Sequence, residues 1–330
     1  MPTRRLVPIA VACLCCLGTP VLHAAEGTSP GFTTGPDVES LESERPSALT
    51  LPKAIVLGVI EGVTEYLPVS STGHLAVAER LLGIGRTSAE KRAADAYAVV
   101  IQGGAILAVL LLCLGRIRSM LRGLVGRDRD GLRLLVNLVV AFVPAAALGL
   151  ALEPVRTRLY GVWPIVGAWI VGGLFILLLV RGRSAGVRTG VGVPEAAGRP
   201  LESLAWSNAL VIGIAQAVAI WPGVSRSLVT IAAAMLLGFS VPAAVEFSFL
   251  LGLLTLGAAT GYEAVKSGSE IVAAFGIVTP IVGFAVAAVS AFAAVRWMVS
   301  WLKSRSLSVF GWYRIGLGAV VAALAIAGLV

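Results

Sequence analysis

The sequence has few charged residues for its length. Asp, Glu, Lys and Arg together make up 13% of the 330 residues, whereas a soluble domain carries about 25%. Hydrophobic residues make up 57% of the chain, and apolar runs of about 20 residues recur, each long enough to cross a bilayer core of about 30 Å. This composition excludes a soluble enzyme or binding domain and indicates an integral membrane protein.

The apolar runs also lack the alternating pattern of a membrane β-barrel. Inside lipid every backbone polar group must find a partner within the protein, so a continuous apolar run has to be a helix. We therefore predict an all-α, polytopic membrane protein.

Cysteine and histidine are scarce, with four and two residues. Cys13, Cys15 and Cys16 lie in the N-terminal apolar stretch and Cys113 in a predicted membrane helix, which gives no metal-ligand or disulfide spacing. Basic residues outnumber acidic ones, 26 to 18, but they lie between the apolar runs rather than on one polar face. We therefore interpret them as signals of membrane orientation and expect no nucleic-acid partner.

The N-terminus is typical of a secretory signal peptide over residues 1–25. Arg4 and Arg5 precede an apolar core, and Ala24 lies at an imperfect cleavage site, so an uncleaved anchor is the alternative. Residues 26–50 are polar and acidic and predict a disordered tether on the periplasmic side.

Eight apolar segments follow, of two kinds. Six uninterrupted runs predict membrane spans: 97–115, 134–152, 161–180, 242–262, 271–295 and 308–329. The other two, 51–83 and 206–238, carry Pro, Gly, Ser and charged or polar residues near their middle. They predict re-entrant, broken helix pairs whose turns are buried in protein or line a cavity.

Arginine-rich loops give the orientation. Residues 116–133 and 181–205 are rich in arginine and are predicted to be cytoplasmic. Threading the six spans through them places residues 85–96, 153–160 and 263–270 outside, together with the N-terminus that a signal peptide requires.

The two broken segments are related by an internal repeat. Residues 55–83 align without a gap on residues 210–238, so that Gly58 matches Gly213 and Ser70 matches Ser225. The chain then divides into membrane repeats at 51–180 and 206–330, joined by the 181–205 loop. Because three spans follow the first broken segment, the second enters from the opposite face, which predicts an inverted-topology repeat with both turns near the midplane.

Two carboxylates lie in the first broken segment. Glu61 and Glu65 are four residues apart and share one face of a helix. At membrane depth such a pair is costly and self-repelling unless a cation or a proton lies between the carboxylates. The pair predicts a divalent-cation site or an acid/base pair; the structural alternative is that both face an aqueous loop.

Hydroxyl groups and a histidine follow these carboxylates. Pro68 should stop the helix, after which Ser70, Ser71 and Thr72 can present hydroxyls to an anion or cap the next helix. His74 comes within four residues of both serines and predicts a general acid, or a base to a nucleophile.

The second broken segment offers an arginine instead of carboxylates. Pro222-Gly223 breaks the helix, and Arg226 then lies between Ser225 and Ser227. A guanidinium in apolar surroundings matches phosphate bidentately, although a salt bridge to Glu61 or Glu65 is the alternative.

Together the two turns suit phosphoryl transfer on a lipid-linked phosphate, with a cation and Arg226 neutralising the phosphate charge. A rival interpretation is a polyprenyl-phosphate flippase or secondary transporter, in which Arg226 binds the same phosphate and the carboxylates carry protons.

Two long motifs resemble a known family. The run from Glu61 to His74, and the run from Pro222 to Ser227 with Thr230, are similar to those of the undecaprenyl-diphosphatases (bacitracin-resistance proteins), and the resemblance covers residues 51–330. It implies hydrolysis of undecaprenyl diphosphate to the monophosphate lipid carrier of cell-wall synthesis, at a site open to the periplasm in the bacterial inner membrane.

The resemblance also implies five catalytic residues, and the hydroxyl groups of the two turns are expected to bind substrate. The implied catalytic residues are Glu61, Glu65, Ser71, His74 and Arg226, with Mg²⁺ or Ca²⁺ at Glu61 and Glu65, and the expected substrate-binding residues are Ser70, Thr72, Ser225, Ser227 and Thr230. Attack by Ser71, assisted by His74, and direct attack by water both stay open, as does a homodimer. Leu228 and Gly103 depart from the family pattern.

Overall fold

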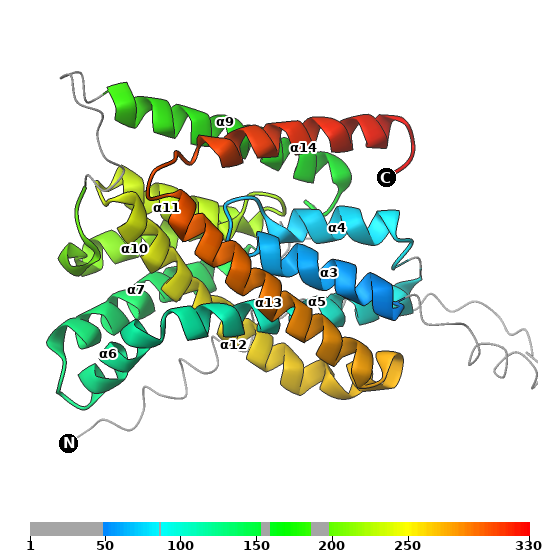
Figure 1. The fold of residues 1–330 in the computed structure, drawn as a ribbon, viewed down its shortest axis with the longest axis horizontal. Coiled ribbons are helices and arrows are strands. Elements are labelled where there is room, and N and C mark those ends of the chain that lie inside the picture. The colour runs from blue at the N-terminus through cyan, green and yellow to red at the C-terminus, as the bar shows by residue number, and fades with distance from the viewer. Residues whose placement is uncertain (1–48, 86, 153–158, 186–197) are drawn as a thin grey trace, which may run out of the picture.

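The computed structural model describes residues 49–85, 87–152, 159–185 and 198–330 (Figure 1). The predicted signal peptide and nearly all of the predicted tether lie outside these residues. Within them, six helices are long and apolar enough to cross a membrane: α5 (Ser88–Leu112), α7 (Arg129–Ala151), α9 (Val162–Ala185), α12 (Val241–Phe275), α13 (Val278–Trp301) and α14 (Ser308–Ile326). The prediction of an all-α, multi-pass membrane protein is confirmed.

The boundary between the fourth and fifth spans was predicted wrongly. Residues 263–270 are helical, because α12 continues to Phe275 and ends only at Gly276, whose φ is 65°. Lysine and glutamate are good helix formers, so a polar stretch alone does not end a helix. Glycine in the left-handed region does end it, and α13 therefore begins at Val278.

Two other predicted loops contain helix. Helix α5 starts at Ser88, inside the expected 85–96 loop, because Thr87 forms a capping box: Glu90 N donates to Thr87 Oγ1 at 3.1 Å, and Thr87 N donates to Glu90 Oε2 at 3.3 Å.

The arginine-rich 116–133 loop is largely occupied by the short helix α6 (Leu114–Leu124). The turn that follows is closed by Asp128, whose carboxylate accepts from Gly131 N at 2.9 Å and Ser119 Oγ at 2.7 Å. These hydrogen bonds hold the pKa of the Asp128 carboxyl below its usual value.

Both predicted helix pairs are present. The first consists of α3 (Leu51–Thr64) and α4 (Ser71–Leu81), and the second of α10 (Trp206–Gln216), a 3₁₀ turn η2 (Ala217–Ile220) and α11 (Arg226–Leu236). At 1.5 Å per residue these helices are about 16–21 Å long, too short to cross a bilayer core of about 30 Å alone.

The backbone repeats where the sequence repeats. Ser70 and Ser225 both have positive φ, 74° and 79°, and Gly83 and Gly238 do too, at 65° and 87°. Positive φ is uncommon for serine. Because both pairs share the offset of the aligned sequences, the two segments turn in the same way at the same points.

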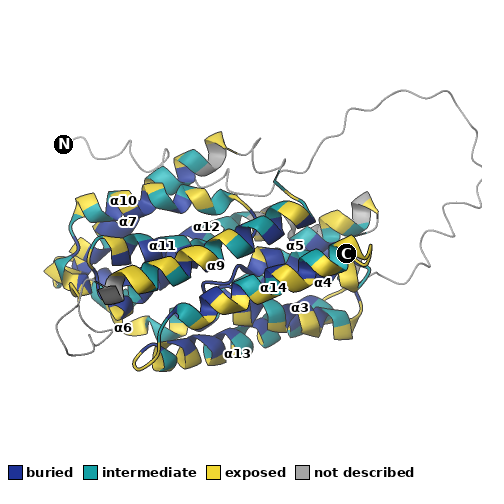
Figure 2. Ribbon diagram, turned by 90° about the horizontal axis from the view of Figure 1, so that it is seen from above, coloured by how far each residue is buried: buried dark blue, intermediate teal, exposed yellow. Residues whose placement is uncertain are grey.

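The helices form a bundle in which α13 packs on α3 and α5, α14 on α9, and α10 on α7. In Figure 1 the α3–α4 pair and the α10–α11 pair lie at opposite ends of the molecule, and α9 and α14 run side by side along one edge. Figure 2 shows the buried residues on the faces where helices meet. Apolar side chains such as Val171, Val289 and Ile326 are exposed, as lipid-facing positions require.

Candidate functional site

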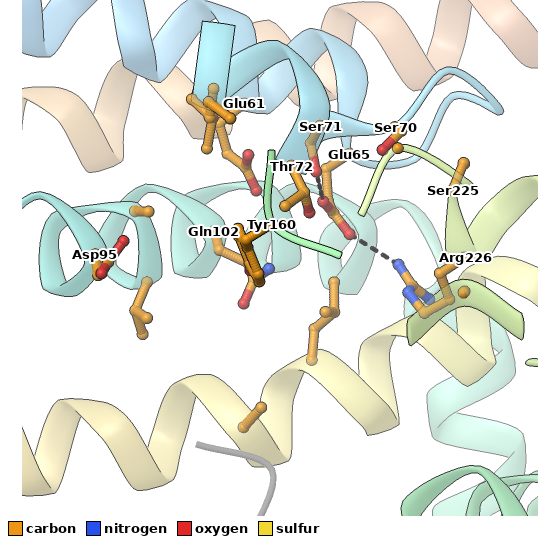
Figure 3. A pocket seen from close by; sticks show the side chains of 18 of the residues that line it. Glu61, Glu65, Ser70, Ser71, Thr72, Asp95, Gln102, Tyr160, Ser225 and Arg226 are labelled. Carbon is orange, nitrogen blue, oxygen red and sulfur yellow. Dashed lines mark hydrogen bonds and ion pairs between the residues drawn. The ribbon is translucent and has the colours of Figure 1, made fainter. Parts of the chain in front are cut away.

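A cavity of about 320 Å³ lies where the two helix pairs meet α5 and α12 (Figure 3). Its wall includes seven of the ten predicted site residues: Glu61, Glu65, Ser70, Ser71, Thr72, Ser225 and Arg226. The two broken segments, 155 residues apart in sequence, therefore both contribute residues to the wall of one cavity.

The first turn supplies the carboxylates. Glu61 lies in the last turn of α3 and Glu65 just beyond its end, and their exposed fractions are only 2% and 9%. The Ser71 hydroxyl, at the start of α4, donates to Glu65 Oε2, and Figure 3 shows this contact inside the cavity. Glu65 is thus placed to take a proton from Ser71 or from a water molecule beside it.

The second turn supplies the guanidinium. Arg226 begins α11, and its Nη2 lies 3.0 Å from Glu65 Oε1. The salt bridge that was the alternative to phosphate binding is therefore present, with Glu65 as the partner. Nε and Nη1 are buried and have no hydrogen-bond partner among the described residues. A buried donor without a partner is costly, and a phosphate oxygen is the acceptor that this fork matches best.

A glycine makes room for this guanidinium. A Cβ on Gly252 of α12 would lie 2.2 Å from Arg226 Nη1, so any larger residue there would have to displace the arginine. The site therefore depends on α12 as well as on the two turns.

Ser225, Ser227 and Thr230 hold the second turn together. Ser225 Oγ caps α11 by accepting from Leu228 N at 3.3 Å, and Ser227 Oγ donates to Leu67 O at 2.8 Å. Thr230 Oγ1 donates to Arg226 O at 3.0 Å. Neither Ser227 nor Thr230 is among the described residues lining the cavity, so their contact with substrate stays a prediction.

His74 lies behind the cavity wall. Its Nδ1 is 2.6 Å from Ser70 O and must carry the proton of that hydrogen bond, so in the neutral ring Nε2 accepts from the Tyr313 hydroxyl at 2.8 Å. The ring also stacks on Tyr313 and meets Trp169 edge-on. The structure pairs Ser71 with Glu65 rather than with His74, and a catalytic role for His74 stays a prediction.

Arg314 is one of the residues that the sequence analysis missed. It is fully buried in α14, and its Nη1 donates to Pro68 O at 3.1 Å, while Nη2 donates to Ala168 O at 2.8 Å and Gly223 O at 2.9 Å. One side chain therefore binds both turns and α9. The signal was available, since Arg314 is the one charged residue in the run 308–329, and an ionisable residue at membrane depth marks a functional position by default.

The cavity wall contributed by α5 was also missed. Lys91, Asp95 and Gln102 line the cavity from α5, and Lys91 Nζ pairs with Glu79 at 3.2 Å and with Asp95 at 2.6 Å. Because α5 was predicted to begin only at residue 97, Lys91 and Asp95 were assigned to a loop. The i, i+4 spacing of these two residues was the available signal.

A divalent cation fits the residues present. The described residues contain no group of three or more His, Cys, Asp or Glu that could form a complete metal cage. Mg²⁺ is commonly held by one or two carboxylates together with substrate phosphates. Glu61 and Glu65 are therefore suited to a cation that arrives with a phosphorylated substrate.

Known proteins are similar in sequence to this chain along most of its length. The family model described as "Bacitracin resistance protein BacA" matches residues 54–320. An undecaprenyl-diphosphatase of Sorangium cellulosum is 43% identical over 270 residues, covering 81% of this chain and 84% of that protein. Undecaprenyl-diphosphatase 2 of Rhodospirillum rubrum is 40% identical over 280 residues, covering 84% and 96%. The chain therefore belongs to the family of the bacitracin resistance protein BacA, and the two relatives named above are undecaprenyl-diphosphatases.

Proposed function

We propose that the protein hydrolyses undecaprenyl diphosphate to undecaprenyl phosphate and inorganic phosphate, which recycles the lipid carrier of peptidoglycan synthesis. The names of its relatives support this activity. The observation that carries it is the pairing of Arg226, with two unsatisfied donors, and the Ser71–Glu65 hydrogen bond in one cavity. An anion site next to a hydroxyl and its base is what phosphate hydrolysis needs.

In the serine route, Ser71 Oγ attacks the terminal phosphorus and its proton passes to Glu65. The new O–P bond forms as the bond to the bridging oxygen breaks, and undecaprenyl phosphate leaves. Water then hydrolyses the phosphoserine and releases inorganic phosphate.

In the water route, a water molecule attacks the terminal phosphorus directly while Glu65 takes its proton and Ser71 holds Glu65 in place. The bond from that phosphorus to the bridging oxygen breaks, and undecaprenyl phosphate and inorganic phosphate are released in one step. In both routes Arg226 balances the charge that builds on the phosphoryl oxygens.

A divalent cation, Mg²⁺ or Ca²⁺, is part of this proposal. Both oxygens of Glu65 are already engaged by Arg226 and Ser71, so Glu61 would be the second carboxylate ligand and the diphosphate would supply the remaining ligands. When bound, the cation would neutralise phosphate charge and orient the leaving group.

The two helix pairs are, in this proposal, re-entrant and related by an inverted-topology repeat. Their short helices, the matching positive-φ residues and the three spans between them, α5, α7 and α9, support that arrangement. Their positions at opposite ends of the molecule in Figure 1 agree with it.

The site would then open to the periplasm. Lys91 and Asp95 line the cavity near the N-terminal end of α5, whereas the C-terminal end of α5 leads into α6 with Arg116, Arg118 and Arg122. A spanning helix has its ends on opposite faces, and arginine-rich segments favour the cytoplasmic one.

The test is phosphate release from undecaprenyl diphosphate by purified protein in detergent, with Mg²⁺ or Ca²⁺ and with EDTA. Metal-dependent release that EDTA abolishes supports the phosphatase. Detergent removes the two compartments that transport requires, so a folded protein that binds the lipid without releasing phosphate would favour the flippase.

A further inference from the structure

An apolar groove of about 340 Å³ runs beside the polar cavity, between α9 and α11. Its walls come from Phe175 of α9, Ala215 of α10, Val218 of η2, and Ala233 and Leu236 of α11. Several wall residues are well exposed, Leu236 at 67% and Val218 at 58%, so the groove opens toward lipid along its length.

The groove and the polar cavity share one wall. Trp221 lines both. The residues after it are divided between the two spaces: Gly223 and Ser225 of the turn line the polar cavity, whereas Val224 of the turn and Leu228 of α11 line the groove. Trp221 is held in place by a hydrogen bond from its Nε1 to Pro164 O at 3.0 Å. A molecule with a charged head and an apolar tail could therefore occupy both spaces at once.

We propose that this groove binds the segment of the polyprenyl chain adjoining the diphosphate, with Trp221 at the junction. The inference rests on the proposed function, because it takes a prenyl diphosphate as the ligand. A head group on Arg226 needs an apolar exit for its chain, and the groove begins within the same turn. Helix α11 extends about 15 Å from Arg226 to Leu236, so the groove takes only the start of a long chain and leaves the rest in the bilayer.

Packing, rather than the hydrophobic effect, would set the affinity of the groove. The chain leaves one apolar medium for another, so little apolar surface is removed from water. What the groove adds is dispersion contact with its walls. A bulky side chain placed in it should therefore exclude the prenyl chain by steric overlap and leave the reacting groups untouched.

The experiment compares Ala233→Phe with wild type on two substrates, undecaprenyl diphosphate and the five-carbon isopentenyl diphosphate. Ala233 lies two turns beyond Arg226, out of reach of a five-carbon chain. We expect KM for undecaprenyl diphosphate to rise about tenfold or more with kcat unchanged, while the kinetics on isopentenyl diphosphate stay as in wild type. Val289→Phe, on the 71% exposed face of α13, is the matched control and should change neither.

A second readout does not depend on catalysis. A photoreactive benzoylphenylalanine replacing Leu236 should crosslink to undecaprenyl diphosphate, and excess unlabelled substrate should compete it away. Wild-type kinetics in Ala233→Phe, or crosslinking only to bulk membrane lipid, would overturn the groove assignment. If wild type hydrolysed neither substrate, the phosphatase proposal would fail while the crosslink still decided whether the groove binds the chain.

Discussion

At the scale of single residues, Ser71 has the most informative partner, because its hydroxyl donates to Glu65 rather than to His74. Ser71→Ala removes the nucleophile in one route and the group that positions the base in the other. We expect kcat to fall about 10²-fold or more, within the range that positioned acid–base groups contribute. Ser300→Ala, on an exposed face of α13, is the control.

A phosphoserine trapped on Ser71 after rapid acid quenching would select the serine route. Retention of kcat within a few-fold of wild type in Ser71→Ala would contradict the site as described.

Arg314 gives a residue-scale prediction about stability. Arg314→Met would leave the carbonyls of Pro68, Ala168 and Gly223 without their donor. A buried carbonyl left without its donor costs about 1–3 kcal/mol, so the loss of the donor to three carbonyls should lower the thermal midpoint by roughly 5 °C or more. Because Arg314 holds both turns in position, kcat should also fall when it is measured at temperatures well below the midpoint.

Arg296→Met, at an exposed position on α13, should leave both the midpoint and kcat unchanged. Equal midpoints for wild type and Arg314→Met would show that the three carbonyls find other partners.

At the scale of elements, close helix packing holds the carboxylates. A Cβ on Gly62, next to Glu61, would lie 2.1 Å from Ser290 Oγ and 2.3 Å from Ala287 O of α13. Gly62→Ala should therefore push α3 from α13, lowering both the thermal midpoint and phosphate release. Gly257→Ala in α12 has nothing within 4 Å of its Cβ and is expected to be neutral; similar losses in both variants would refute the packing argument.

The sequence predicted the elements better than their ends. Hydrophobic runs identified six spans because their apolar length is a composition signal, and Pro68 and Pro222-Gly223 marked the interrupted pairs. The start of α5 and the join of α12 to α13 depend on the Thr87 capping box and on Gly276. Both features lie in or beside polar stretches, and the polar composition led to the prediction of loops there.

For the site, too, the sequence predicted which residues take part better than how their side chains are arranged. Seven of the predicted residues line the cavity because the motifs lie at helix breaks, which face protein or a cavity. The orientation of His74 toward Tyr313, 239 residues away, depends on how α14 packs. No local pattern encodes that contact, nor the three carbonyls that Arg314 reaches.

At the scale of the whole molecule, chemical labelling of introduced cysteines can test the proposed membrane orientation. In a background without the four native cysteines, Arg92→Cys, at an exposed position next to Lys91 in α5, should react with an impermeant maleimide in intact cells. Arg122→Cys, on α6 at the far end, should react only after permeabilisation, because α5 separates the two positions. The reverse pattern would place the site on the cytoplasmic side.

The proposed activity requires that the two helix pairs meet to form one phosphate site, with Arg226 from the second pair acting on a group held by the first. The most direct measurement is kcat/KM for undecaprenyl diphosphate in Arg226→Lys, which keeps the charge but loses the fork. We expect a fall of about 10²–10³-fold in a protein with a wild-type thermal midpoint. A kcat/KM within a few-fold of wild type would show that the guanidinium is only a salt-bridge partner of Glu65, and would contradict the account.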